Sequence, residues 1–259
     1  SEPQAGSDVM GMRTKAVRDG DDWVINGTKC WISGVVQADW YTVFAKTSDD
    51  VTERNHNSIS AFIVERGWEG VEVGSTDRKM GVRGVDTGEL LLSNVRVPAA
   101  NVIGEIGGFQ LAMQGLNSMR PIVAARGIGL AEGALMYATE YVKERAAFRK
   151  TIADMQGIQW EVAKLATEIE AARLLTYRAA WLKDQGRPFK QEAAIAKLYA
   201  TESAVTATRM ATQIFGGYGF MDETLVARQY RDAKILEIGE GTSEIQRLVI
   251  ARGLGLPVT

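Results

Sequence analysis

Hydrophobic residues in the first hundred positions occur in short runs whose pattern is typical of β-strands. Turn signals such as Asn26-Gly27 and Ser33-Gly34 separate these runs. The predicted strands include residues 23–25, 40–44, 59–64 and 89–92. Strands at regular spacing without intervening helices favour a β-sandwich or barrel over a parallel α/β sheet.

From about residue 109 the hydrophobic residues change to helical spacing. Pro98 and the glycine-rich segment 104–108 precede this change, so we expect one domain over residues 1–103 and a second over residues 104–259. The first helix is expected over residues 109–144. It is dense in Gly and Ala, which lowers its intrinsic helix propensity and predicts close packing against other helices.

Further helices complete the predicted second domain. Apolar residues at positions 158, 162, 165, 169 and 172 alternate spacings of four and three, which indicates a packed helical seam. Gly186 and Pro188 end this helix, a third is expected over residues 191–214, and a short segment leads to a last helix after Ser243. The fold class is therefore α+β and multidomain, with a β-sandwich or barrel-like domain followed by a four-helix bundle.

Composition excludes several classes of function. The 259 residues are 46% hydrophobic with a formal net charge of −2, which is typical of a soluble globular protein with no basic surface for nucleic acid. A single Cys and a single His exclude a disulfide framework and argue against a zinc site. No apolar run reaches the roughly 20 residues of a membrane-spanning helix. The sequence starts at Ser1 without an initiator Met, so we expect it to be part of a longer chain.

The stretch IGEGTSEIQR, residues 238–247, places Glu240 between two glycines just before the last helix. Ser243 is expected to be the N-cap of that helix, with Gln246 closing a capping box. Because the glycines leave the Glu240 carboxylate uncrowded, it suits a catalytic base that must approach a planar ligand. The alternative is an acidic residue that is simply favoured near the positive end of a helix dipole.

Three other stretches combine small or hydroxyl residues with positions that suit ligand contact. They are SEPQAGSD at residues 1–8, GTKCWIS at residues 27–33 and QIFGGYGF at residues 213–220. Each alone is also typical of an ordinary loop or helix end. Together with IGEGTSEIQR, and with a β region before a helical region, they resemble the acyl-CoA dehydrogenase family. The resemblance covers the family's middle β domain and C-terminal helical domain, and this sequence lacks the N-terminal helical domain that precedes them there.

The resemblance implies an FAD site. The matching positions are Ser1, Gly6, Ser7, Trp31, Ser33, Arg145, Phe148, Gln156, Gln213, Gly216, Gly217, Thr242 and Glu244. A Trp at the place of Trp31 screens the flavin ring in the family, although the residue alone would be taken for a core aromatic. Arg145 and Phe148 match residues that reach the FAD of a neighbouring subunit, which implies a homo-oligomer, either a dimer or a tetramer. An Arg suits this place because it makes charge-assisted hydrogen bonds to phosphate oxygens.

The resemblance also implies that Glu240 is the catalytic base. In the family this residue removes the pro-R α-proton of an acyl-CoA thioester while hydride passes from the β-carbon to flavin N5, which gives a trans-2-enoyl-CoA. Burial by substrate would raise the pKa of this carboxylate and the helix start would lower it, and the sequence does not decide between them. Substrate contacts are implied for Ser7, Asn117, Arg120, Gly241 and Arg252. For Arg120 the alternative is a cation held by a surface acid.

Four positions depart from patterns that are common in the family. Met119 stands where branched-chain and long-chain members place their base, so Glu240 is the only family base position that holds a carboxylate. Gly239 replaces the Tyr of medium-chain members, which changes the expected pocket width. A hydroxyl residue is common at Ala147, and Gln is common at Glu244.

The expected function is that of an FAD-dependent acyl-CoA dehydrogenase with an electron-transferring flavoprotein as acceptor. Two alternatives remain from the sequence, namely an acyl-CoA oxidase that uses oxygen and a non-catalytic pair of flavin- or CoA-binding domains. The resemblance implies a location in the bacterial cytoplasm or the mitochondrial matrix. His56 aligns loosely with a substrate contact, and we expect it to be dispensable.

Overall fold

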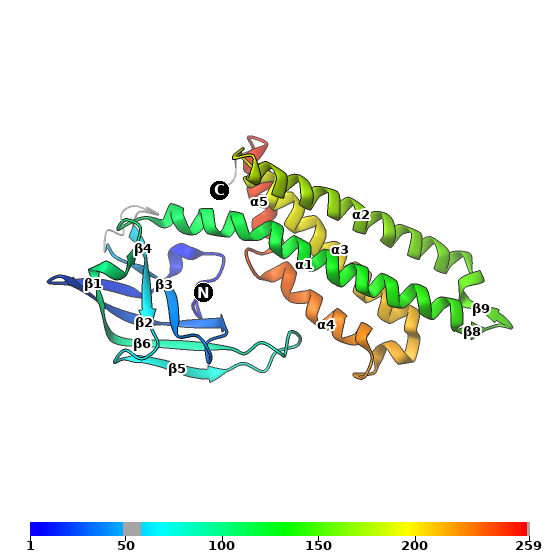
Figure 1. The fold of residues 1–259 in the computed structure, drawn as a ribbon, viewed down its shortest axis with the longest axis horizontal. Helices are drawn as coiled ribbons and strands as arrows, with labels where there is room; N and C mark the ends of the chain where they lie inside the picture. Colours follow the sequence, from blue (N-terminus) through cyan, green and yellow to red (C-terminus); the bar gives the residue numbers. More distant parts are fainter. Residues whose placement is uncertain (49–57, 258–259) are drawn as a thin grey trace. The chain divides into compact units, whose positions relative to one another are not determined.

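The computed structural model describes residues 1–48 and 58–257, so His56 lies outside the described residues. The chain forms two compact units, Ser1–Gly115 and Leu116–Thr259. The first unit is built on a β-sheet and the second is helical (Figure 1). The predicted order of a β region followed by a helical region is therefore confirmed. The two units divide after Gly115, within the first long helix, whereas the glycine-rich segment suggests a boundary after residue 103.

In the described part of the first unit, seven strands form one mixed sheet in the order β5-β6-β2-β1-β3-β4-β7. The strands are β1 (Lys15–Asp19), β2 (Asp22–Ser33), β3 (Trp40–Lys46), β4 (Ile59–Glu65), β5 (Val71–Thr76), β6 (Thr87–Pro98) and β7 (Val102–Ile103). Short 3-10 helices lie at Val9–Gly11 (η1) and Ala99–Asn101 (η3). The predicted runs lie in β2, β3, β4 and β6. The hydrophobic pattern misses β1 and β5, because each offers few buried side chains.

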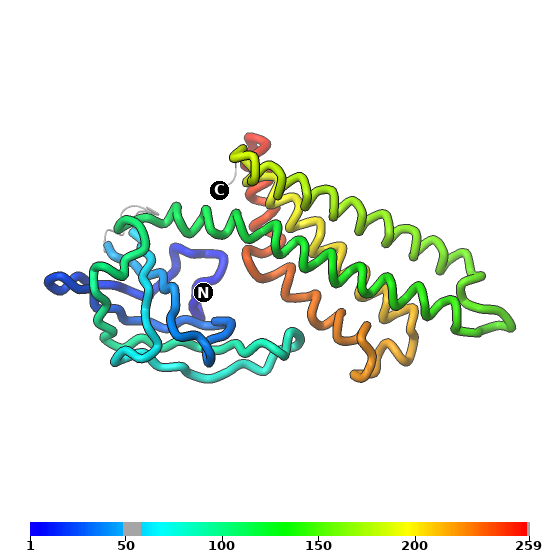
Figure 2. The backbone as a smooth tube through the Cα atoms, in the orientation of Figure 1, coloured from blue at the N-terminus to red at the C-terminus, as the bar shows by residue number. Residues whose placement is uncertain are grey.

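The sheet curves around one hydrophobic cluster, and its path can be followed in Figure 2. A second, smaller cluster of the same unit joins Met12, Ile59 and Phe109. Trp23 on β2 and Phe62 on β4 meet edge to face with 5.8 Å between ring centroids, although β1 and β3 separate their strands in the sheet. This contact requires the sheet to bend until its own inner face meets itself. The first unit therefore has the expected sandwich-like or barrel-like form, in which one face of the sheet packs against itself.

The helices are α1 (Phe109–Glu144), α2 (Gln156–Asp184), α3 (Lys190–Phe215), α4 (Leu225–Ile238) and α5 (Ser243–Gly253). A small hairpin of β8 (Ala146–Ala147) and β9 (Lys150–Thr151), followed by the 3-10 helix η4 (Ile152–Asp154), joins α1 to α2. The 3-10 helix η5 (Gly216–Phe220) follows α3. The predicted bounds of α1 and α3 are confirmed to within one residue. The sequence predicts only a short segment between the third helix and the last one, and this is wrong, because α4 lies there and buries Val226, Ala227, Ala233 and Leu236.

Small residues bring the bundle helices close together. One core cluster joins Ala124 on α1, Leu165 on α2 and Ala200 on α3. A Cβ atom at Gly127 would lie 2.9 Å from the carbonyl oxygen of Ala200, so only glycine fits at this crossing of α1 and α3. The predicted close packing of α1 and the apolar seam of α2 are both confirmed. None of the helices in the described part of the chain is both long and apolar enough to span a membrane.

Candidate functional site

The start of α5 is built differently from its sequence prediction. Thr242 is the N-cap, and its side-chain oxygen accepts a hydrogen bond from the Ile245 backbone N–H at 3.3 Å. Ser243, the predicted N-cap, is the first helical residue, and its buried hydroxyl has no hydrogen-bond partner among the described residues. Gln246 does not close a capping box, because its Nε2 donates to the Gly241 carbonyl at 2.8 Å. The predicted cap is therefore wrong by one residue.

Glu240 and Gly241 form a left-handed turn immediately before this cap. Their φ angles are 55° and 91°, and the conformation at Glu240 is unusual for a residue with a side chain. A Cβ atom at Gly241 would lie 2.8 Å from Nε2 of Gln246, so a side chain at this position would collide with its neighbour. The Glu240 carboxylate is exposed. A strained backbone of this kind is costly, by about 1–3 kcal/mol, and such residues cluster at functional sites.

Arg120 on α1 is the first of two buried cations near this turn. It is only 5% exposed, and its Nη1 donates to Oδ1 of Asn117 at 2.7 Å. Burial lowers the pKa of Arg120, and the charge of Glu240 acts in the opposite direction. The structure thus brings three of the predicted residues, Asn117, Arg120 and Glu240, into one electrostatic environment. The alternative of a cation held by a surface acid is wrong, because Arg120 is buried and its partner is the half-buried amide of Asn117.

Lys197 on α3 is the second buried cation, and it is not among the residues predicted from the sequence. Its side chain is fully buried, and its Nζ donates to the Gly241 carbonyl at 2.7 Å. Burial and the charge of Arg120 lower the pKa of Lys197 to about 8. A signal was available in the sequence, because Lys197 shares helical spacing with Ala193, Ala200 and Ala204 on the buried face of α3.

Other predicted residues in this region are exposed. Met119 precedes Arg120 and is 43% exposed, so α1 offers a thioether and no carboxylate at that position. Glu244 and Arg252 lie on the surface of α5, and no described contact joins Arg252 to the turn at Glu240. Hydrogen bonds at the helix start, from its own backbone N–H and from Thr242, lower the pKa of Glu244. The Glu244 side chain is exposed to solvent, at the position where Gln is expected from the resemblance.

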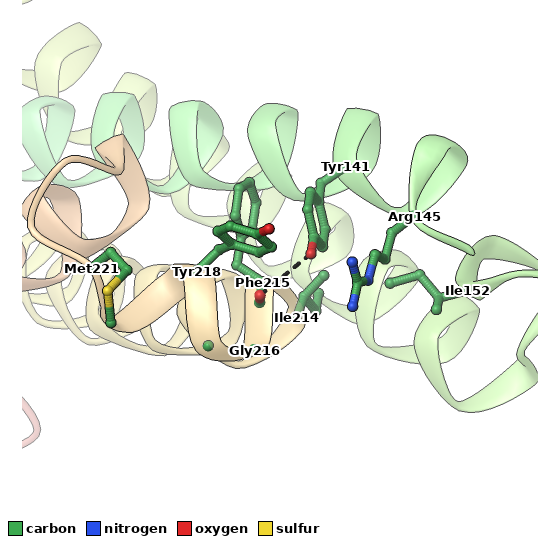
Figure 3. Close-up of a pocket in the computed structure, with 9 residues that line it drawn as sticks. Tyr141, Arg145, Ile152, Ile214, Phe215, Gly216, Tyr218 and Met221 are labelled. Carbon is green, nitrogen blue, oxygen red and sulfur yellow. Dashed lines mark hydrogen bonds between the residues drawn. The ribbon is translucent and has the colours of Figure 1, made fainter. Parts of the chain in front are cut away.

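A hollow of about 500 Å³ lies at the far end of α3. Arg145, Gly216 and Gly217, all predicted to bind the nucleotide, line it together with Tyr141 and other residues (Figure 3). The Tyr141 and Phe215 rings stack with 4.1 Å between centroids and form one wall. Gly216 has a φ of 59°, and a Cβ atom there would meet nothing within 4 Å, so its backbone is open to a ligand. Gln156 and Gln213 are close to these residues in the sequence and are exposed, but neither of them lines the hollow.

Phe148 lies at the tip of the β8–β9 hairpin and is 89% exposed. It and Arg149 have φ angles of 52° and 64°, the geometry of a type I′ turn, which favours Asn and Gly over bulky residues. An aromatic side chain in this strained, exposed place is costly in the isolated chain. The arrangement is consistent with the predicted contact to a neighbouring subunit, which stays a prediction.

The N-terminal loop is fixed by a buried carboxylate, Glu2, which is not among the residues predicted from the sequence. Glu2 is 2% exposed and accepts hydrogen bonds from Lys29 Nζ, from the Gln4 side chain, from the Thr14 hydroxyl and from the backbone N–H groups of Arg13 and Thr14. Burial alone would raise the pKa of Glu2, but these hydrogen bonds, led by that from Lys29, outweigh it and lower the pKa to about 2. The predicted flavin-loop residues Gly6 and Ser7 remain exposed beside this anchor.

Trp31 is 60% exposed and has a φ of 58°. It lies in an irregular part of β2, where the pairing with β6 shifts register between Lys29 and Ile32. The alternative of a core aromatic is therefore wrong for Trp31. The Cys30 backbone N–H donates to the Ser1 carbonyl at 3.0 Å, so the structure brings Ser1 beside Trp31, and Ser33 is exposed at the end of the same strand.

Solved structures share this fold over almost the whole chain. Butyryl-CoA dehydrogenase from Megasphaera elsdenii is 44% identical with a TM-score of 0.94, over 98% of this chain and 66% of that chain. A family model described as acyl-CoA dehydrogenase, middle domain, matches residues 1–95, and one described as acyl-CoA dehydrogenase, C-terminal domain, matches residues 107–255. The chain therefore belongs to the acyl-CoA dehydrogenase family, as its motifs predict. Members of this family are flavoproteins.

Two curated relatives show how far the similarity extends. The acryloyl-CoA reductase (NADH) of Anaerotignum propionicum is 48% identical over 255 residues, which are 97% of this chain and 64% of that protein. A probable acyl-CoA dehydrogenase of Bacillus subtilis is 49% identical, over 98% of this chain and 67% of that protein. The chain thus spans about two thirds of the length of the relatives it matches.

Proposed function

We propose that the full-length protein is an FAD-dependent acyl-CoA dehydrogenase in which Glu240 is the catalytic base. The observation that carries this proposal is the Glu240–Gly241 turn. Its left-handed backbone presents an exposed carboxylate, and two buried cations, Arg120 and Lys197, lie near it. Met119 supports the assignment because the rival family position offers no carboxylate.

Glu240 would remove the α-proton of the acyl thioester, and the bound product would be a trans-2-enoyl-CoA. The exposed carboxylate is free to approach a substrate carbon, and the turn limits the positions that it can adopt. The backbone N–H of Glu240 would donate to the thioester oxygen, where negative charge develops as the proton leaves. When bound, FAD supplies an acceptor for the hydride from the β-carbon.

The residues present fit an FAD molecule by their chemistry. In the first unit, the exposed Trp31 indole offers an apolar cover for a flavin ring, and the N-terminal loop offers an open backbone at Gly6 and the exposed Ser7. In the second unit, the hollow near Gly216 offers an aromatic wall, an open backbone and the Arg145 guanidinium, a donor set that suits a nucleotide with phosphates. Thr242 and Glu244 complete the predicted set at the start of α5.

The partners follow from the same reasoning. An electron-transferring flavoprotein is the proposed acceptor. A homo-oligomer, a dimer or tetramer, is proposed because the exposed Phe148 and the open hollow near Arg145 would each gain a partner from a neighbouring subunit. A bacterial cytoplasm or a mitochondrial matrix is the proposed location.

The deciding experiment adds acyl-CoAs of graded chain length to flavin-loaded, full-length protein without oxygen. We expect the flavin absorbance to bleach with a subset of chain lengths and an enoyl-CoA to form. Rapid reoxidation of the bleached protein by oxygen would favour an acyl-CoA oxidase. No bleaching with any acyl-CoA, despite tight binding, would favour a non-catalytic binding module.

A further inference from the structure

The peptide that follows the proposed base is held by two buried side chains. Lys197 Nζ and Gln246 Nε2 both donate to the Gly241 carbonyl, at 2.7 and 2.8 Å. A carbonyl oxygen has two acceptor lone pairs, so these bonds use its full capacity. One donor comes from the middle of α3 and the other from the first turn of α5. The orientation of the Gly241 peptide is therefore fixed from two rigid helices.

Lys197 is an expensive residue for a purely structural role. Its side chain has no solvent exposure, and its partner is a neutral carbonyl rather than a carboxylate. Burying a charge without an opposite charge is unfavourable, and apolar replacements of buried charges are often neutral or stabilising. The neighbouring positions on the same face of α3 are Ala193, Ala200 and Ala204, all buried. Packing of the bundle alone therefore does not account for a lysine here.

We propose that Lys197 is a positioning residue for Glu240. Its ammonium group holds the Gly241 carbonyl and thereby keeps the preceding residue in the left-handed conformation that presents its carboxylate. This inference rests on the proposed function, because it assigns Lys197 a part in the step that Glu240 performs. It adds a residue on α3 to a site otherwise described on α1 and at the start of α5.

The charges that act on Lys197 come from several elements. Arg120 on α1 repels it, whereas Glu202 on α3, Glu237 on α4 and Glu240 in the turn attract it. Burial is the largest influence, and it lowers the pKa of Lys197 to about 8. Above that pH the ammonium becomes an amine, and its charge-assisted hydrogen bond to Gly241 becomes a weaker neutral one. The rate of proton removal is therefore expected to fall above about pH 8.

The test uses flavin-loaded, full-length protein with Lys197→Met, which removes donor and charge, and Lys197→Gln, which keeps a donor without charge. Lys190→Met is the matched control, because Lys190 is exposed at the start of the same helix. We expect Lys197→Met to slow anaerobic flavin bleaching at saturating acyl-CoA by about 10- to 100-fold, the effect of a small misplacement of a reacting group. The bleaching rate of the Gln variant should lie between those of the wild type and Lys197→Met. In both variants the decrease of this rate above pH 8 should disappear. The amount of bound flavin and the affinity for acyl-CoA should hardly change.

A second measurement does not depend on turnover. Amide hydrogen exchange of residues 238–247 should be faster in Lys197→Met than in wild type, while exchange in α2 stays the same. Wild-type exchange in this segment together with a wild-type rate and pH profile would overturn the proposal. So would a slower rate that disappears after correction for flavin content. If none of the acyl-CoAs bleaches the flavin of the wild-type protein, the proposed function fails. The exchange measurement still decides whether Lys197 holds the turn.

Discussion

Two predicted ligand-binding segments are each anchored by a buried charged side chain, but the two charges have different hydrogen-bond partners. In the N-terminal loop, the Glu2 carboxylate is paired with Lys29 at 2.7 Å and accepts further hydrogen bonds from side chains and backbone. At the turn before α5, the buried Lys197 ammonium is bonded to the neutral Gly241 carbonyl. The first charge has a bonded opposite charge, whereas the second, among the described residues, is bonded only to a neutral group.

This difference indicates what each anchor does. A compensated carboxylate within a network of hydrogen bonds produces a small field outside the network, so its main effect is on the stability of the loop. A buried cation without a paired anion destabilises the fold but keeps a positive potential at the turn, where Glu240 lies. Breaking the first anchor should therefore cost stability, and breaking the second should cost activity.

The largest effect is expected at Glu240 itself. Glu240→Gln removes the proposed base, and we expect anaerobic bleaching by acyl-CoA to slow by about 10²- to 10⁴-fold, the usual contribution of a positioned base. Stopped-flow absorbance measures this rate. Glu223→Gln is the control, because Glu223 is also exposed and lies just before α4. Bleaching of Glu240→Gln at the wild-type rate would refute the assignment of the base.

The next largest effect is expected at Glu2. Glu2→Gln leaves the Lys29 ammonium buried without its anion, which we expect to lower the free energy of unfolding by about 3–5 kcal/mol. Urea unfolding measures the loss, and Glu69→Gln is the control because Glu69 is an exposed acid of the same unit. A Glu2→Gln, Lys29→Met double variant should regain most of the loss. Equal stability of Glu2→Gln and wild type would show that the pair is not an anchor.

Glu2 also predicts a dependence of stability on pH. Its pKa is about 2 in the folded protein against an ordinary value of 4.5, so the unfolded chain binds the proton more readily. The stabilisation is complete above about pH 4.5 and is lost as the pH falls toward 2. The free energies of unfolding of wild type and Glu2→Gln should therefore converge as the pH falls from about 4.5 to about 2.

For Lys197 the slope of stability against pH has the same sign, but here burial destabilises the charged form of the residue. Its pKa is lowered to about 8 from 10.5, so the unfolded chain binds more protons between these values, and this residue's contribution to stability rises as the pH increases through them. At neutral pH, Lys197→Met removes an uncompensated charge, and we expect the free energy of unfolding to stay equal or to rise by about 1 kcal/mol. Thermal unfolding tests this expectation. A large loss of stability would instead make Lys197 a structural residue and remove the contrast with Glu2.

The sequence predicts the elements and motifs well but misses both anchors, for a physical reason. The helices α1 and α3 are long and flanked by glycine or proline residues, so their bounds are predicted closely, whereas α4 has only 14 residues. Buried charges are rare, so a Glu in a loop or a Lys on a helix is assigned to the surface. Only tertiary contacts show that Glu2 meets Lys29 and that Lys197 reaches Gly241.

The predicted cap of α5 fails for a different reason, and this leads to the smallest expected effect. Because Glu240 and Gly241 both adopt positive φ, the chain enters the helix one residue earlier, and Thr242 takes the cap. Thr242→Ala should therefore lower the free energy of unfolding by about 1 kcal/mol, whereas Ser243→Ala should change it by about 0.5 kcal/mol or less. The two variants lie at adjacent positions and each removes one hydroxyl, with a methyl group in addition at Thr242, so each is the control of the other in urea unfolding. A larger loss of stability for Ser243→Ala than for Thr242→Ala would show that Ser243 is the N-cap, as the sequence predicts. The turn that holds Glu240 would then end one residue later.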